Sequence, residues 1–275
     1  MRILVCMLVV TALLMAPKIW LDSRQDHAVP RLPSAAYRNA SPGRIVYDDQ
    51  TGTVLVDGTA LPLSDIAIRR SISKRPPNTQ SYIVIWDWLG IKEVTASARG
   101  LDGKHYIANS FLVGFKPFHT DKIWVPLYTI AMRKHYVKDD QSYAGLQDIW
   151  QNSRQGFYQR RGDCEDHAIV LADWLIELGV DARVVLGTHK GEEHAWVVAI
   201  IDDKEYLLEA TSKRRSTTWA SMPLAKLALG YRPKFQFNRE YFWSLSEEGH
   251  ESVHIGEYRG ELWNRKSRFV SSKNI

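Results

Sequence analysis

The feature that most constrains the fold is a long apolar helix followed at once by three strands. The helix is predicted to begin at Cys164 and to stop at Gly179, a residue that readily adopts the backbone conformation of a helix end. Residues 182–186, 194–201 and 206–210 then have the composition of strands. The order helix, strand, strand, strand predicts an α+β fold.

Composition limits the class of protein. The 275 residues are enough for a large core, and 45% hydrophobic with 24% charged residues is ordinary for a globular chain. The net charge of +5 is modest, and the basic runs at 160–161 and 213–215 are short. We therefore expect no nucleic acid as a partner.

The N-terminus has the form of an export segment. Arg2 precedes an apolar stretch at 3–16, so residues 1–21 are predicted to be a signal peptide or a membrane anchor. Fourteen residues rise only about 21 Å as a helix, so an uncleaved anchor spanning a core of about 30 Å would also need residues 18–21. Either form predicts a periplasmic or secreted protein, in the second case one anchored in the inner membrane.

Four further regions follow in the chain. Residues 22–43 are rich in Ser, Pro, Arg and Asn and are predicted to be a linker. Residues 44–120 are strand-rich and begin with a hairpin around 48–52, while residues 121–245 hold the helix and strands described above. The aromatic stretch near the end of that region is expected to cover a sheet edge, and residues 246–275 form a polar tail.

Cys164 is a candidate nucleophile. The other cysteine, Cys6, lies in the export segment, so no disulfide is possible in the body of the chain. Asp163 is suited to cap the helix and Asp166 to complete a capping box. A cysteine at the first helical position lies at the positive end of the helix dipole, which favours its thiolate.

Three acidic residues oppose that effect. Asp163, Glu165 and Asp166 occupy the same turn as Cys164, and like charge disfavours a thiolate. A cation is therefore needed nearby. It could be a protonated histidine, or a Ca²⁺ ion held by these carboxylates, because hard cations prefer oxygen ligands.

His194 and Glu209 are placed to complete a catalytic group. If the strand starting at His194 returns through a two-residue turn at Asp202-Asp203, residue 211 lies opposite His194. Glu209 is then on the same face, one diagonal step away. This predicts a nucleophile, a base and an orienting carboxylate at Cys164, His194 and Glu209.

Three short blocks resemble the signature of the transglutaminase-like superfamily, and the first is closest to the bacterial transglutaminase-like cysteine proteinases. The blocks are GDCEDHA at 162–168, GEEHAWV at 191–197 and LLEAT at 207–211. Trp150 similarly matches a tryptophan that precedes the cysteine. The resemblance implies a papain-like core, a Cys-His-carboxylate triad and calcium bound near the cysteine. Glu209 stands where the family has aspartate, and His167 where an aromatic residue is more common.

The sequence therefore predicts a cysteine hydrolase that cleaves a peptide or amide bond in a protein or peptide substrate. Transfer of the acyl group to an amine uses the same chemistry and is left open. A non-catalytic binding or scaffold module of the cell envelope is the alternative, and a metal-dependent enzyme without thiol chemistry is a third. His167 lies one turn from Cys164 and is expected to be a solvated residue on the helix face.

Overall fold

The structure is a computed structural model that describes residues 44–48, 53–57, 82–88, 91–212, 222–245 and 256–268. All of them belong to one compact unit, Ser34–Ile275. The predicted export segment and linker lie outside the described residues. Among the residues described, no helix has the length and apolar character to cross a membrane.

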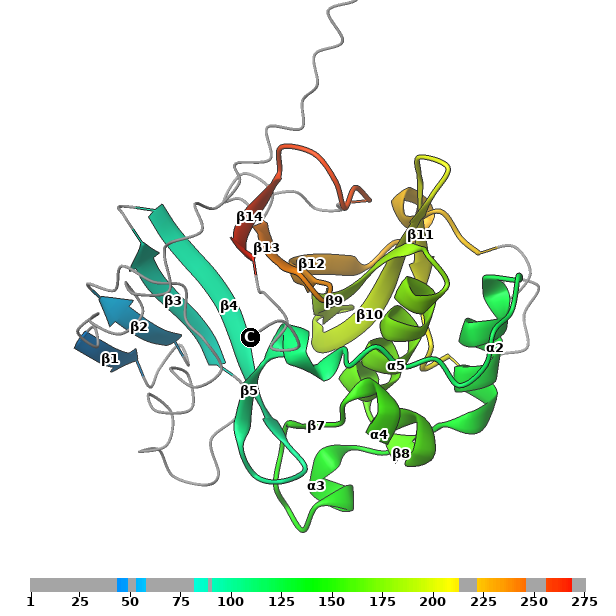
Figure 1. Ribbon diagram of the computed structural model, residues 1–275, viewed down its shortest axis with the longest axis horizontal. Helices are drawn as coiled ribbons and strands as arrows, with labels where there is room; N and C mark the ends of the chain where they lie inside the picture. Colours follow the sequence, from blue (N-terminus) through cyan, green and yellow to red (C-terminus); the bar gives the residue numbers. More distant parts are fainter. Residues whose placement is uncertain are drawn as a thin grey trace, which may run out of the picture. The chain divides into compact units, whose positions relative to one another are not determined.

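The central sheet has six strands, all paired antiparallel, in the order β11-β10-β9-β12-β13-β14 (Figure 1). The strands are β9 (Asp181–His189), β10 (Glu192–Ile201), β11 (Lys204–Leu208), β12 (Tyr231–Phe237), β13 (Tyr241–Leu245) and β14 (Trp263–Arg268). The prediction that the aromatic stretch covers the sheet edge is wrong, because β12 and β13 are strands of the sheet itself. The polar tail also contributes a strand, β14.

Helix α5 (Cys164–Glu177) packs on β9 and β10, and it begins and ends where the sequence predicts. Gly179 follows it with a φ of +83°, the left-handed conformation that glycine adopts without strain. Eleven of its fourteen residues are buried, which joins the helix to the sheet through one apolar core. Mixed helix and sheet structure is thus confirmed.

A second sheet contains the N-terminal strands. Its path is β1 (Arg44–Asp48), β2 (Thr53–Asp57), β3 (Tyr82–Trp88), β4 (Ile91–Gly100) and β5 (His105–Ile107). The predicted first hairpin is confirmed by the antiparallel pairing of β1 and β2. Strand β7 (Ile149–Trp150) also pairs with β4.

Two short helices are set by specific side-chain hydrogen bonds. Residues after Ile107 form the 3₁₀ helix η2 (Ala108–Phe111) rather than a continued strand, because the Asn109 side chain turns to donate to the carbonyls of Asn238 and Tyr241. Residues 149–150 form β7 rather than a helical face, and the helix begins only at α4 (Ser153–Tyr158), where Asn152 and Gln155 make a capping box.

The remaining elements surround the start of α5. Helix α2 (Trp124–Arg133) packs against α5, and Pro126 lies in its first turn, where a proline is tolerated. It is followed by β6 (His135–Tyr136), α3 (Asp139–Ser142) and, after α4, β8 (Arg161–Gly162). The 3₁₀ helix η4 (Ala225–Leu227) precedes β12.

Candidate active site

Cys164 is the first residue of α5 and is partly buried. Asp163 precedes it in an extended conformation, as expected of an N-cap residue, but its side chain makes no capping hydrogen bond. The predicted capping box is wrong, because Asp166 turns instead to accept a hydrogen bond from the Gln151 amide at 2.7 Å. The Cys164 thiol donates to Glu165 Oε2 at 3.3 Å.

A short parallel pairing fixes the chain just before the cysteine. Strand β8 pairs with β6, so that Gly162 lies opposite Tyr136, and the Val137 amide donates to the Gly162 carbonyl at 3.0 Å. Gly162 has no room for a side chain, because a Cβ there would lie 2.2 Å from Asp166 Oδ2. The close approach of the Gly162 backbone to the Asp166 carboxylate thus fixes the position of the chain just before Cys164.

His194 lies on β10 and bonds to Glu209. Its Nε2 is 2.6 Å from Glu209 Oε2, which leaves Nδ1 as the nitrogen available to Cys164. Burial lowers the pKa of His194, but hydrogen bonds to Cys164 and Glu209 outweigh it and raise the pKa from 6.5 to about 10. The structure therefore brings the three predicted residues together, since His194 interacts with both Cys164 and Glu209.

The register that brings Glu209 to His194 is the predicted one. Ile201 pairs with Lys204 around a two-residue turn, and Val197 pairs with Leu208. Both turn residues, Asp202 and Asp203, have positive φ, which is typical of the turns that suit a twisted hairpin. Continued past Leu208, this pairing places residue 211 opposite His194.

Four donors surround the Glu209 carboxylate. Oε1 accepts from the Thr211 amide at 3.0 Å and the Thr211 hydroxyl at 2.5 Å, and Oε2 accepts from His194 and from the Tyr231 hydroxyl at 3.2 Å. Burial raises the pKa of Glu209, but the bonds and charge of His194 and the bonds from Thr211 outweigh it and leave the pKa below its ordinary value. The carboxylate is thus held ionised.

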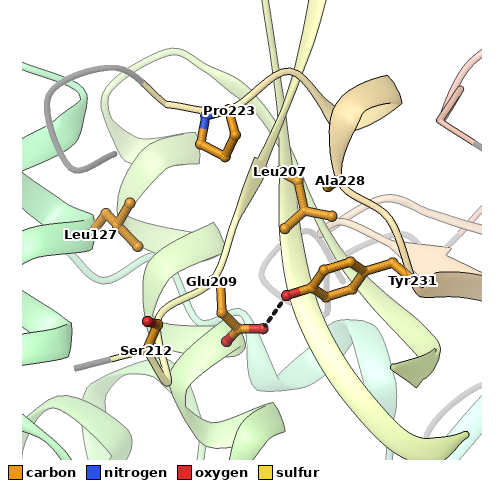
Figure 2. A pocket seen from close by; sticks show the side chains of 7 residues that line it. All are labelled: Leu127, Leu207, Glu209, Ser212, Pro223, Ala228 and Tyr231. Carbon is orange, nitrogen blue, oxygen red and sulfur yellow. Dashed lines mark hydrogen bonds between the residues drawn. The ribbon is translucent and has the colours of Figure 1, made fainter. Parts of the chain in front are cut away.

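Tyr231 also forms a wall of this site. Its ring stacks on His189 with centroids 4.0 Å apart and meets Trp196 edge-on at 5.1 Å. Figure 2 shows Glu209 and Tyr231 meeting inside a pocket that Leu127, Leu207, Ser212, Pro223 and Ala228 also line. An apolar recess therefore adjoins the carboxylate.

His167 is not a solvated residue. Its side chain is fully buried, and Nδ1 lies 2.6 Å from the Asp163 carbonyl, while Tyr136 packs near its ring at 6.3 Å. The expectation for this residue is wrong, because the β6 strand covers this side of α5. His167, one turn from Cys164, instead forms a hydrogen bond with the backbone carbonyl of the N-cap residue Asp163.

The acidic turn has a buried counter-cation that the sequence did not reveal. Lys134 is only 1% exposed, and its Nζ donates to the carbonyls of Gly156 (2.9 Å), Gln159 (3.2 Å) and Arg161 (3.3 Å) and to Gln151 Oε1 (3.3 Å). Burial lowers the pKa of Lys134, while Asp166, Asp163, Glu165 and Asp139, in that order, act to raise it. Lys134 therefore interacts electrostatically with all four carboxylates.

A candidate cation site lies beside the cysteine. Oxygen atoms of Asp139, Asp163 and Glu165 all fall within 4.8 Å of one another, whereas the predicted third ligand, Asp166, lies outside this group. Burial, and then the charge of Asp163, raises the pKa of Asp139 to about 7. The Oδ1 atoms of Asp139 and Asp163 are buried without a hydrogen-bond partner, so this set of oxygens fits a divalent cation.

Sequence reasoning missed Lys134, Asp139, Thr211 and Tyr231. Lys134 follows an amphipathic helix and resembles an ordinary C-terminal lysine, and Tyr231 lies twenty-two residues from its partner Glu209. Only Thr211 carried a signal, because the predicted register already placed it opposite His194.

A family model matches within this region. Residues 148–245, just over a third of the chain, match a family model described as the CEP76 peptidase-like domain. The matched stretch contains Cys164, His194, Glu209 and Tyr231, whereas Lys134 and Asp139 precede it.

Several vertebrate proteins share a shorter segment. The centrosomal protein of 76 kDa from Mus musculus and that from Homo sapiens are each 42% identical to this chain over 55 residues, and that from Xenopus tropicalis is 38% identical. The segment is 20% of this chain and 8% of each relative. These relatives are not bacterial, unlike the proteinases that the cysteine motif resembles.

A crystal structure of a provisionally assigned cysteine protease from Cytophaga hutchinsonii aligns with 48% of this chain and 45% of its own, at 16% identity. The TM-score is 0.29, and a likeness at that level supports no conclusion about fold or chemistry.

Proposed function

We propose that this protein is a cysteine hydrolase that cleaves a peptide or amide bond through Cys164, His194 and Glu209. The observation that carries the proposal is the position of His194, which is bonded to Glu209 at 2.6 Å through Nε2 and also interacts with Cys164. The match to a peptidase-like domain over residues 148–245 supports it.

In this mechanism His194 takes the thiol proton and Cys164 attacks the substrate carbonyl. His194 then returns the proton to the leaving amine, and Glu209 orients and stabilises the imidazolium. The backbone amide of Cys164, at the start of α5, contributes to stabilising the oxyanion. Water or an amine then accepts the acyl group, which gives hydrolysis or transfer.

The test is the rate at which iodoacetamide alkylates Cys164 near neutral pH. We expect alkylation faster than that of free cysteine, and slower alkylation in His194→Ala and Glu209→Ala. His119→Ala is the control, because His119 is an exposed imidazole whose ring bonds to Asp121 and not to Glu209. Alkylation no faster than that of free cysteine, or unchanged by His194→Ala, would refute the proposal.

Turnover is measured with fluorescein-labelled casein, in the presence and absence of a dansyl-labelled amine. Release of labelled peptides that disappears in Cys164→Ala supports hydrolysis, whereas incorporation of the amine supports transfer. Turnover that survives in Cys164→Ala would contradict the role of the thiol and favour metal-dependent chemistry.

The second candidate is a non-catalytic binding module with a transglutaminase-like core. The observation that favours it is the hydrogen bond from the Cys164 thiol to Glu165, since a protonated thiol is a poor nucleophile. Slow alkylation together with an absence of turnover would decide for this function.

Calcium is proposed to bind at Asp139, Asp163 and Glu165. When bound, it would supply positive charge beside the acidic turn. Asp163 and Glu165 are the ligands that the sequence predicts, and Asp139 replaces Asp166 in the set because one of its carboxylate oxygens lies within 4.8 Å of theirs. Isothermal titration with Ca²⁺, which needs no substrate, tests this site.

Export is also proposed, and it rests on residues 1–21 alone. The relatives are named for the centrosome and not for an exported compartment. The location of this protein therefore needs a test separate from that of its chemistry. Fractionation of cells that express the full chain, with sequencing of the mature N-terminus, separates a cleaved signal from an anchor. Recovery only in the cytosol with Met1 intact would refute export.

A further inference from the structure

We propose that Tyr231 and Thr211 are positioning residues that hold the Glu209 carboxylate against His194, a role that rests on the proposed function. Each acts through Glu209, and together they supply three of the four donors around its carboxylate.

The need for such a support follows from the length of the side chain. Glutamate has one rotatable bond more than the aspartate of the resembled family, so it loses more conformational freedom when it is fixed. A single bond to His194 would leave the carboxylate free to turn about its own axis. Bonds to both oxygens remove that rotation.

The two supports approach from opposite elements. Thr211 lies just beyond β11 and binds Oε1 through both its amide and its hydroxyl, whereas Tyr231 begins β12 and binds Oε2. Oε2 is the oxygen that also accepts from His194. Tyr231 therefore fixes the oxygen in contact with the base, and Thr211 fixes its partner oxygen.

The Tyr231 ring is itself held in place. It is 9% exposed, stacks on His189 with an interplanar angle of 6°, and meets Trp196 edge-on. Its hydroxyl is thereby directed at Glu209, as Figure 2 shows. Phenylalanine would preserve this packing and remove only the donor.

The experiment measures solvent exchange of the His194 Nε2 proton by NMR, a readout independent of activity. A proton in a 2.6 Å bond to a fixed carboxylate should exchange slowly. We expect exchange to be about tenfold faster in Tyr231→Phe, the fold-change that corresponds to loss of one hydrogen bond to a charged group. Thr211→Val should also accelerate exchange, and Thr211→Ser should restore the slow rate.

Tyr258→Phe is the matched control. Tyr258 is a buried tyrosine in the same aromatic cluster, but its hydroxyl accepts from Trp196 Nε1 and does not bond to Glu209. Its loss should destabilise the fold without changing exchange at His194. Equal effects of Tyr231→Phe and Tyr258→Phe, or no effect of Tyr231→Phe, would overturn the proposal.

A double-mutant cycle connects the positions to the chemistry. Tyr231→Phe should slow alkylation of Cys164 when Glu209 is present and have no further effect in the Glu209→Ala background. An equal effect in both backgrounds would overturn the proposal. If wild-type alkylation is no faster than that of free cysteine, the proposed function fails, and the NMR result still decides whether Tyr231 and Thr211 hold the carboxylate.

Discussion

Replacing Lys134 by methionine removes the ammonium group that faces the acidic turn while keeping a stem of similar length. Lys134 is buried, and its Nζ has four acceptors within 3.3 Å. The change leaves three backbone carbonyls and Gln151 without this donor. It also leaves the four nearby carboxylates without their buried counter-charge.

The magnitude follows from these contacts. A hydrogen bond from a charged donor contributes about 1.5–3 kcal/mol, so three donors give roughly 5–9 kcal/mol. Burying the ammonium group costs several kcal/mol, which offsets part of that sum. The expected net loss is therefore about 3–5 kcal/mol, the typical cost of removing one member of a buried ion pair. Since a domain is stable by only about 5–15 kcal/mol, Lys134→Met should remove about a fifth or more of the free energy of unfolding.

Urea unfolding followed by tryptophan fluorescence measures the loss. We expect the transition of Lys134→Met to move to lower urea with an unchanged slope. The exposed Lys138 provides the control, and Lys138→Met should change the free energy of unfolding by no more than about 0.5 kcal/mol.

If Lys134→Met does not fold, adding Asp166→Asn should recover a measurable transition, because it removes the carboxylate with the largest influence on Lys134. A loss below about 1 kcal/mol in Lys134→Met would refute the assignment of Lys134 as the counter-cation of this turn.

Three further results are expected. Calcium at one hundred times its dissociation constant should add about 2.7 kcal/mol to the free energy of unfolding. Asp139→Asn should abolish that gain, whereas Asp140→Asn, at an exposed neighbouring residue, should leave it unchanged. The raised pKa of His194 contributes stability that is complete below pH 6.5 and is lost as pH rises toward 10, so unfolding free energy should fall less over that range in Glu209→Gln than in wild type. Gly162→Ala should lower the free energy of unfolding by about 1–3 kcal/mol because its Cβ meets Asp166, and an unchanged melting temperature would contradict that contact.

The parts of the site that sequence could predict are those set by local rules. Helix α5 is read from its apolar face and from Gly179, and the register of His194 with Glu209 follows from a two-residue turn and the period of a strand. These elements need no knowledge of distant packing. Their predicted placement agrees with the structure.

The parts that sequence could not predict depend on contacts between distant elements. Lys134 reaches the acidic turn only because α2 packs against α5, and Tyr231 reaches Glu209 only because β12 pairs with β9. His167 looked solvated because its helix position alone does not show that β6 covers it. The predicted role of Asp166 in a capping box failed for the same reason, since the Gln151 amide offers its carboxylate a different partner.

The location of Lys134 has a consequence for dissecting the chain. A fragment cut to the matched residues 148–245 would retain Cys164, His194 and Glu209 but would lack α2 and Lys134. Its acidic turn would then be left without the buried amine. An active recombinant fragment should therefore begin before Trp124, and an inactive shorter one would say nothing about the chemistry of the full chain.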